Sequence, residues 1–394
     1  MSEHLLPSGY RNALFIDLDI LSRNYKNLTG LLLSQEPFAV VKAEAYGHGG
    51  VEVARVVYEA GARWFGVAAV EEAEALRAAG ADEGRDGFAD ARILVMSDTL
   101  AYNAGRMVEA DCDAAVWHME QVRGLASAAR GAGRKARIHV KVDTGMGRLG
   151  LRPAEAVDFI ERASQEEGVE IAGLMSHFAR ADEVEGEAAT SAQIREMEAL
   201  VHALGEKNLL PPHIHMANSA GLLNYPRAPG NLVRLGIALY GSSPQFSNSV
   251  ALKCAMTWVA RVLQVKEVEA GRSIGYGGTY ERRSPGRIAM VSTGYGDGYP
   301  RILSNRADAL VGGVRVPVAG RVSMDMLALD VTNIENIAPG DEVVLLGDQG
   351  DGAVGCEEIA ERAETIPYEI MCGVGVRVPR IYLRGGRVTH VRKL

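Results

Sequence analysis

Short β-rich runs alternate with helical stretches through the first 240 or so residues, and this alternation constrains the fold more than any other feature. Glycines such as Gly61 and Gly168 follow several of the helical patterns as stop signals. Strands alternating with helices predict a parallel sheet with crossover connections. The number of units favours an α/β (β/α)8 barrel over a doubly wound sheet. The runs that read as strands are residues 14–17, 39–42, 65–68, 93–96, 114–117, 138–142, 171–176, 213–216 and 232–235.

The pattern changes near residue 245, where residues 245–249 read as a boundary. Beyond it, strand-like runs follow one another with no helix between them, at residues 256–268, 288–292, 309–318, 326–331 and 342–346. Such runs predict a mostly antiparallel β domain. In a chain of 394 residues we therefore expect two domains, a TIM-type barrel over residues 1–245 and a β domain over residues 246–394.

Composition excludes several classes of partner. The net charge of −8 is spread along the chain without basic stripes, which argues against nucleic acid and anionic membranes. Four cysteines lie far apart, so we expect reduced thiols and no disulfide scaffold or structural zinc. The N-terminus has no signal layout, and no apolar run is long enough to span a bilayer. These features predict a cytoplasmic protein.

Lys42 ends an apolar run and is followed by a glycine-rich turn that begins at Tyr46. Desolvation at the end of a buried strand lowers the pKa of an amine and makes it nucleophilic, which Schiff-base chemistry requires. The alternative is a lysine whose stem covers the strand end while its amine reaches water. The lysine alone does not decide between these two interpretations.

Polar side chains recur where the predicted barrel strands end, and active groups belong at those C-terminal ends. Two arginines, a hydroxyl and backbone N–H groups form a suitable site for phosphate and carboxylate anions. Taken singly, His177 reads as a core histidine and Arg234 as a salt-bridge partner. The strand ends carry Lys42, Asp143 with Arg148 just beyond, His177, Asn218 with Ser219, and Arg234 running into Gly236.

Three further motifs suggest other functions. Residues 145–150 spell G-x-G-x-x-G, but Pro153 places the next helix start beyond the motif, which disfavours dinucleotide binding. His213 and His215 share a strand face, and a metal-dependent barrel hydrolase uses such pairs, although it places them on its first strand. Residues 295–300 are consistent with a tight turn centred on Asp297.

Taken together, the motifs resemble those of a known family. Residues 41–49 resemble the lysine motif that binds pyridoxal 5'-phosphate in alanine racemases. The resemblance spans most of the chain, and it continues in residues 141–150, 176–178, 215–219, 233–241, 274–277, 294–299, 320–325 and 365–369.

This resemblance implies a barrel followed by a β domain, a head-to-tail homodimer, and interconversion of L-alanine and D-alanine that supplies D-alanine for peptidoglycan. Lys42 would hold the cofactor as a Schiff base and act as one catalytic base, with Tyr276 of the partner subunit as the other. Inverting a Cα centre requires one group to remove the proton and another to return it on the opposite face. A tyrosine with a pKa of about 10 needs neighbours that stabilise its phenolate, and the resemblance supplies His177 and Arg148.

The resemblance also assigns the remaining site residues. Arg234 would face the pyridine nitrogen, where a fixed cation discourages ring protonation and so disfavours transamination and decarboxylation. Substrate carboxylate would bind Arg148 and the backbone N–H of the partner subunit's Met324. Lys141 would carry a carbamate that orients Arg148. Further cofactor contacts would come from Tyr46, His177, His215, Asn218, Ser219, Gly236, Ile237 and Tyr368, with Asp182, Tyr295 and Arg301 at the entrance.

Some positions depart from the family pattern, and alternatives stay open. Glu44 replaces a usual asparagine and Ser323 a usual cysteine, which puts local hydrogen bonding and substrate range in doubt. Tyr368 crowds the expected site and favours a small side chain such as that of alanine. The alternatives are a serine or broader-specificity amino-acid racemase, a pyridoxal-phosphate-dependent decarboxylase of the same architecture, and a non-catalytic carrier of the cofactor.

Overall fold

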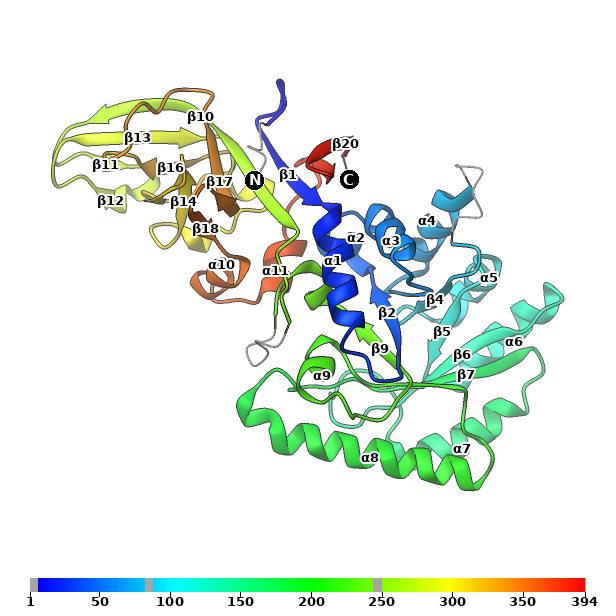
Figure 1. Ribbon diagram of the computed structural model, residues 1–394. Helices are drawn as coiled ribbons and strands as arrows, with labels where there is room; N and C mark the ends of the chain where they lie inside the picture. Colours follow the sequence, from blue (N-terminus) through cyan, green and yellow to red (C-terminus); the bar gives the residue numbers. More distant parts are fainter. Residues whose placement is uncertain (1–5, 82–87, 244–249, 394) are drawn as a thin grey trace. The chain divides into compact units, whose positions relative to one another are not determined.

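The computed structural model describes residues 6–81, 88–243 and 250–393, and their contacts divide into two units (Figure 1). Unit 1 comprises residues 6–21, 46–49 and 253–393. Unit 2 comprises residues 22–45 and the described residues from 50 to 252. The predicted boundary at residues 245 and 246 lies outside the described residues, so this division stays a prediction.

Unit 2 contains the barrel. Its eight strands pair in the order β8-β7-β6-β5-β4-β3-β2-β9, and every pair is parallel. The (β/α)8 prediction is confirmed. The strands are β2 (Glu36–Val40), β3 (Trp64–Val67), β4 (Arg92–Val95), β5 (Asp113–Val116), β6 (Ala136–Lys141), β7 (Val169–Met175), β8 (His213–His215) and β9 (Leu232–Leu235).

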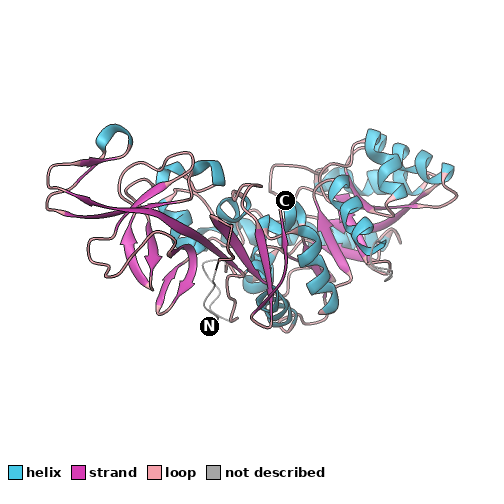
Figure 2. Ribbon diagram, turned by 90° about the horizontal axis from the view of Figure 1, so that it is seen from above, coloured by secondary structure: helices cyan, strands magenta, loops and turns pink. Residues whose placement is uncertain are grey.

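Helices cover the outside of these strands, as Figures 1 and 2 show. Residues of β3 and β5 are buried throughout, as expected for parallel strands covered on both faces. Helix α3 (Gly50–Glu59) buries Val53, Val56 and Val57, the spacing of one helical face. The other helices of this unit are α4 (Val70–Ala81), α5 (Ala104–Glu109), α6 (Met119–Gly131), α7 (Pro153–Ser164), α8 (Glu187–Glu206) and α9 (Ser219–Asn224).

Unit 1 is mostly strand, and nearly all of its pairs are antiparallel, which confirms the predicted β domain (Figure 2). Its long strand β10 (Met256–Val268) pairs with β13 (Gly286–Val291) and with β17 (Glu342–Gln349). Two short helices follow, α10 (Cys356–Arg362) and α11 (Pro367–Cys372). The other strands after β10 are β11 (Ser273–Ile274), β12 (Tyr280–Glu281), β14 (Asp308–Val311), β15 (Val314–Pro317), β16 (Leu327–Asp330), β18 (Gly352–Val354), β19 (Arg380–Arg384) and β20 (Arg387–Arg392).

The first strand of the chain does not belong to the barrel. β1 (Asn12–Asp17) pairs antiparallel with β10 and parallel with β19, so the N-terminal strand completes the sheet of unit 1. Helix α1 (Leu18–Thr29) follows it directly. Among the described residues, no helix combines the length and the apolar character that crossing a membrane requires.

Barrel closure depends on the pairing of β9 with β2, and one buried side chain reinforces it. Tyr240 lies in the 3₁₀ turn Ile237–Tyr240 after β9, and its hydroxyl donates to the Val40 carbonyl oxygen at 2.7 Å. Its side chain is fully buried. This bond fixes the end of β2, two residues before Lys42.

We predict that Tyr240→Phe lowers the free energy of unfolding by about 1 kcal/mol, because a buried hydrogen bond is lost. Tyr102→Phe is the matched control, since the Tyr102 hydroxyl donates to Asp98 at 3.2 Å on a residue that is 73% exposed. The control should change the free energy by less than about 0.5 kcal/mol. Urea unfolding of the two variants measures both, and equal losses would contradict the role of Tyr240.

Candidate active site

Arg234, in β9, is a buried cation near the C-terminal ends of the barrel strands. Its Nη1 donates to the His215 carbonyl oxygen at 3.1 Å, and its Nη2 donates to the carbonyl oxygens of Ser176 and Met216 at 2.6 and 3.2 Å. It also donates to two imidazole nitrogens, His215 Nδ1 at 2.6 Å and His177 Nδ1 at 2.9 Å. Its Nε has no hydrogen-bond acceptor among the described residues.

The two histidines that accept from Arg234 are neutral and carry their proton on Nε2. A guanidinium only donates, so each Nδ1 must offer its lone pair. Desolvation, followed by the Arg234 charge, lowers the pKa of both His177 and His215 well below its ordinary value. His177 therefore keeps an Nε2–H donor after β7, whereas Nε2 of His215 lies 2.9 Å from His139 Nδ1 inside the barrel.

Lys42 opens a left-handed turn. β2 ends at Val40, and the segment α2 (Lys42–Gly47) has positive φ at Ala43, Glu44, Ala45 and Tyr46, between 51° and 54°. Residues with a side chain avoid this region, at a cost of about 1–2 kcal/mol each. Carboxylates hold the turn, because the Ala43 N–H donates to Glu72 at 2.5 Å and the Glu44 carboxylate accepts from the Gly50 N–H at 2.8 Å.

Like charges gather around Lys141, the last residue of β6. Its side chain is 6% exposed, and its amine makes no hydrogen bond or ion pair with any described residue. Burial, then the cations Arg234, Arg148 and Lys42, lower the pKa of Lys141 to about 8. Burial and Arg148 likewise lower the pKa of Arg234 to about 10, which leaves it charged at neutral pH. The structure thus brings these predicted cations together.

The predicted phosphate contacts also lie together in unit 2. Ser219 Oγ accepts the backbone N–H of Gly236 at 3.0 Å, and the Asn218 side chain caps α9 by accepting from the Gly221 N–H. Ile237 begins the next 3₁₀ turn, where the first N–H groups lack acceptors within the turn. Asp182, a predicted entrance residue, is exposed between β7 and α8.

The other predicted residues belong to unit 1. Tyr46 and Tyr368 lie together, with ring centroids 5.7 Å apart. Burial, with Tyr368 and Cys372 nearby, raises the pKa of Tyr46 above its ordinary value, so its hydroxyl stays protonated. Tyr276 is 71% exposed and follows Gly275, whose φ is 71°.

Three more predicted residues lie in irregular segments of unit 1. The Met324 side chain is exposed, and its backbone N–H has no acceptor among the described residues. Tyr295 and Arg301 each begin a short 3₁₀ turn and are exposed. All three residues are therefore exposed within this unit.

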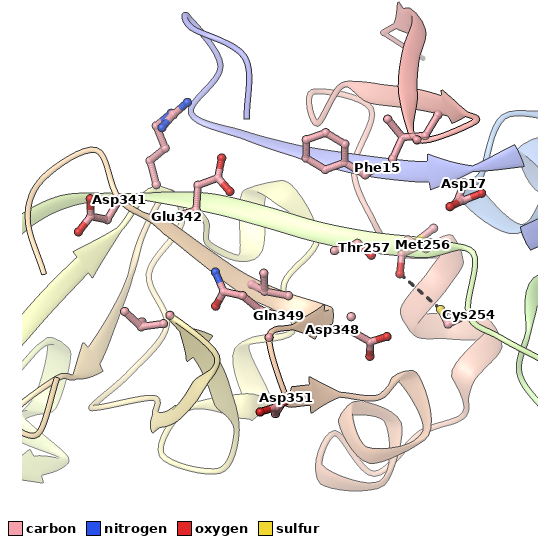
Figure 3. Close-up of a pocket in the computed structure, with 18 of the residues that line it drawn as sticks. Phe15, Asp17, Cys254, Met256, Thr257, Asp341, Glu342, Asp348, Gln349 and Asp351 are labelled. Atoms are coloured by element: carbon pink, nitrogen blue, oxygen red, sulfur yellow. Dashed lines mark hydrogen bonds between the residues drawn. The ribbon is translucent and has the colours of Figure 1, made fainter. Parts of the chain in front are cut away.

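A cavity of about 1170 Å³ in unit 1 lies elsewhere (Figure 3). Its lining includes the acidic side chains of Asp341, Glu342, Asp348 and Asp351, and it contains none of the predicted site residues. Asp348 pairs with Lys253 at 3.2 Å, so part of this negative charge is already balanced. The cavity gives no indication of chemistry.

Two family models cover most of the chain: "Alanine racemase, N-terminal domain" matches residues 16–244 and "Alanine racemase, C-terminal domain" matches residues 255–382. The chain belongs to the alanine racemase family. The alanine racemase of Symbiobacterium thermophilum is 42% identical over 93% of this chain and 96% of its own length. That of Halothermothrix orenii is 39% identical over 93% of this chain and 95% of its own.

Solved structures agree with this assignment. An alanine racemase of Clostridium difficile 630 superposes with a TM-score of 0.90 at 31% identity, covering 98% of this chain and 99% of its own. The alanine racemase of Bacillus anthracis with bound L-Ala-P gives 0.88 at 34% identity, with the same coverage. As a member of the alanine racemase family, the chain is an amino-acid racemase, an isomerase.

In this racemase, sequence reasoning missed two buried polar residues, Asp113 and His139, which hydrogen bonds connect to Arg234 through His215. Asp113 begins β5 and His139 lies within β6, so neither is at the C-terminal end of a strand. Both side chains are fully buried. A carboxylate and an imidazole inside otherwise apolar strands were the available signal. The G-x-G-x-x-G motif lies in the loop before α7, which begins at Pro153 as predicted.

The depressed pKa of Lys141 predicts a pH-dependent stability. The folded-state pKa of about 8 lies below the ordinary 10.5, so the unfolded chain binds this proton more tightly between those pH values. The unfolding free energy should therefore rise with pH across that window, by roughly 3 kcal/mol at about 1.4 kcal/mol per pKa unit. Urea unfolding in CO2-free buffer measures the rise.

Lys141→Met should abolish this contribution, whereas Lys26→Met, which alters an exposed lysine, should retain it. If the wild type and Lys141→Met gave the same slope from pH 8 to 10.5, the interpretation of Lys141 would be wrong.

Proposed function

We propose that this racemase interconverts L-alanine and D-alanine with pyridoxal 5'-phosphate as cofactor, in a head-to-tail homodimer, and so supplies D-alanine for peptidoglycan. The observation that carries the proposal is Arg234, a buried cation whose Nε points to no acceptor among the described residues while both Nη groups are engaged. Bound at this site, the cofactor would supply an electron sink that makes the substrate Cα–H acidic.

Arg234 fits the pyridine ring of this cofactor. A free Nε–H is a donor, and an unprotonated ring nitrogen is an acceptor. A guanidinium that remains charged opposes protonation of that nitrogen. This moderates the electron sink, which favours reversible proton transfer over loss of CO2 or of the amino group.

The rest of the site fits a phosphate and an aldehyde. Ser219 of unit 2 and Tyr46 and Tyr368 of unit 1 would supply hydroxyl groups to a phosphate, and Ile237 a backbone N–H. The Gly236 N–H, which donates to Ser219 Oγ here, would exchange that acceptor for a phosphate oxygen. Lys42 would hold the aldehyde carbon covalently through its amine. The left-handed turn stiffens the segment that carries it.

Two residues would move the Cα proton. Lys42 would take or return it on one face, and the partner subunit's Tyr276 would do so on the other. The Nε2–H of His177, fixed by Arg234 at Nδ1, is a suitable donor to a phenolate. Arg148 would bind the substrate carboxylate together with the backbone N–H of the partner subunit's Met324.

Lys141 supports a second element of the proposal, a carbamate on its amine. A buried amine with a pKa of about 8 is substantially unprotonated under mildly alkaline conditions and can attack CO2. The product is an anion among Arg234, Arg148 and Lys42, which replaces repulsion with attraction. It would orient Arg148 toward the substrate.

The alternatives fit less well. A decarboxylase of this architecture would place a carboxylate opposite the ring nitrogen, whereas the residue proposed for that contact here is Arg234, a cation that hydrogen bonds to His215. A non-catalytic carrier resembles the barrel alone, and this chain has the second domain, matched over residues 255–382. A serine or broader racemase is disfavoured by the bulk of Tyr368 beside Tyr46.

The first test is complementation between two inactive chains. Lys42→Ala and Tyr276→Phe should each abolish racemisation of L-alanine, measured as loss of optical activity. A heterodimer of the two would contain one intact site, with Lys42 from one chain and Tyr276 from the other. Random mixing after dissociation should therefore restore about a quarter of the wild-type activity, because half of the dimers are mixed and each has one working site.

Mixing Lys42→Ala with a Lys42→Ala, Tyr276→Phe double variant is the control, and it should restore nothing. Absence of activity in the Lys42→Ala and Tyr276→Phe mixture, despite subunit exchange, would refute the shared site. Absence of racemisation by the wild type would refute the function itself.

The carbamate makes a separate prediction. Equilibration with ¹³C-bicarbonate should give one carbamate carbon resonance that is absent from Lys141→Met, and removal of CO2 should raise the KM for alanine reversibly. Lys26→Met should keep the resonance. A wild-type spectrum without it, at saturating bicarbonate, would contradict the carbamate.

A further inference from the structure

A chain of buried polar groups runs from Arg234 through the barrel interior to Asp113. Arg234 Nη1 lies 2.6 Å from His215 Nδ1, His215 Nε2 lies 2.9 Å from His139 Nδ1, and His139 Nε2 lies 3.1 Å from Asp113 Oδ2. The side chains of Asp113, His139 and His215 are fully buried. These four residues belong to β9, β8, β6 and β5, and we call them the relay.

The hydrogen bonds of the relay have only one self-consistent direction. Arg234 can only donate, so His215 Nδ1 accepts and its proton is on Nε2. His215 must then donate to His139 Nδ1, which leaves His139 with its proton on Nε2. That proton is donated to the Asp113 carboxylate, which only accepts when ionised. A reversed imidazole anywhere would place two donors or two acceptors face to face.

Asp113 is ionised because cations surround it. Burial alone would raise the pKa of Asp113, but hydrogen bonds from His139 and Arg92 outweigh it and hold the pKa below its ordinary value. Arg92 Nη2 donates to Oδ2 at 2.5 Å, and Arg137 Nε donates to Oδ1 at 2.7 Å. One carboxylate thus receives the relay and two arginines.

A glycine makes room for the relay. His139 on β6 and His215 on β8 are separated by β7, where Gly173 pairs with His139 in the sheet register. A Cβ on Gly173 would lie 2.1 Å from His139 Nδ1, the atom that accepts from His215. Any other residue at 173 would displace the imidazole from its partner. The absence of a side chain at Gly173 therefore permits the contact between His139 and His215.

Arg234 has no direct counter-ion. Its acceptors are carbonyl oxygens and two imidazoles, and no carboxylate of a described residue contacts it. Hydrogen bonds connect this buried guanidinium to the Asp113 carboxylate, two imidazole rings away. Each neutral ring, oriented by its neighbour, presents a lone pair toward the arginine and an N–H toward the carboxylate.

We propose that Asp113 is a positioning residue, which fixes the tautomers of His139 and His215 and thereby holds Arg234 in the orientation that leaves its Nε free. The consequence for catalysis rests on the proposed function, in which this Nε faces the cofactor ring. The relay consists of contacts within unit 2 and does not depend on that assignment.

The test compares the histidine tautomers of the wild type with those of Asp113→Asn. The oxygen of the new amide is more favourable at the Oδ1 position, because there it accepts two Nε–H groups, those of Arg137 and Arg92. The NH2 group then takes the Oδ2 position, where it displaces Arg92 Nη2 and faces His139 Nε2, which has to accept. ¹⁵N-histidine NMR of the full-length protein should show Nε2–H tautomers for His139 and His215 in the wild type. In Asp113→Asn, His139 should change to Nδ1–H and the His215 signals should shift.

Gly173→Ala supports the test without removing a charge. The added methyl group should break the contact between His139 and His215 and shift the His215 signals in the same way. Asp111→Asn is the matched control, because Asp111 also pairs with Arg137 but makes no hydrogen bond to the relay in the described part of the chain, and it should leave both histidines unchanged. Assignments follow from His139→Gln and His215→Gln.

Racemisation kinetics supply the second readout. Asp113→Asn and Gly173→Ala should lower kcat and kcat/KM together by about 10- to 100-fold, the usual effect of losing an outer hydrogen-bond partner. Unchanged His215 signals in both variants would overturn the inference, whatever their activity. A wild-type chain that fails to racemise alanine would refute the proposed function instead, and shifted tautomers would still support the relay.

Discussion

The site depends on a single buried guanidinium. Arg234 makes five hydrogen bonds within unit 2, all through its two Nη groups, and it is the donor in each. Every partner must therefore accept, and this requirement sets the chemistry of the residues around it. Three of the acceptors are backbone carbonyls of Ser176, His215 and Met216, at or just beyond the C-terminal ends of β7 and β8. The barrel therefore provides the acceptors through its strand ends, and the two imidazoles complete them. Neutral histidines in this site are a consequence of burial and of the arginine.

The second constraint is an excess of positive charge. Burial and the neighbouring cations, Arg148 among them, lower the pKa of Lys141 and of Arg234. The Asp143 carboxylate accepts hydrogen bonds from the backbone N–H groups of its own turn. Such a cluster is unfavourable until anions enter it. A phosphate, a substrate carboxylate and a carbamate on Lys141 would each relieve the repulsion. The repulsion among these cations destabilises the empty site, and an anionic ligand that relieves it binds more tightly for that reason.

Periodicity predicted the barrel because each strand of unit 2 is a short apolar run followed by a helical pattern, and it predicted strand ends at Lys141 and Arg234 to within a residue or so. It could not assign β1 to a sheet, because an apolar run does not indicate which strand it will pair with, here β10. The rule that active groups lie at C-terminal strand ends does not indicate Asp113 or His139, because Asp113 begins β5 and His139 lies within β6. Their positions become meaningful once β5, β6 and β8 are folded together, when groups separated by 26 and 76 positions in sequence become neighbours.

The turn after Lys42 shows why a local motif can be recognised without its conformation being predicted. Glycine marks positive φ in a sequence, yet here Ala43, Glu44, Ala45 and Tyr46 adopt it before Gly47 does. Four such residues are unfavourable in isolation. They persist because contacts outside the turn fix both of its ends: the Glu72 carboxylate accepts from the Ala43 N–H, and the Arg380 side chain donates its Nε–H to the Gly47 carbonyl oxygen at 3.1 Å. A turn fixed at both ends in this way is rigid. Lys42, at its start, therefore has few orientations in which to present its amine. The Glu44 carboxylate within the turn accepts from the Gly50 N–H, so this side chain stabilises the turn.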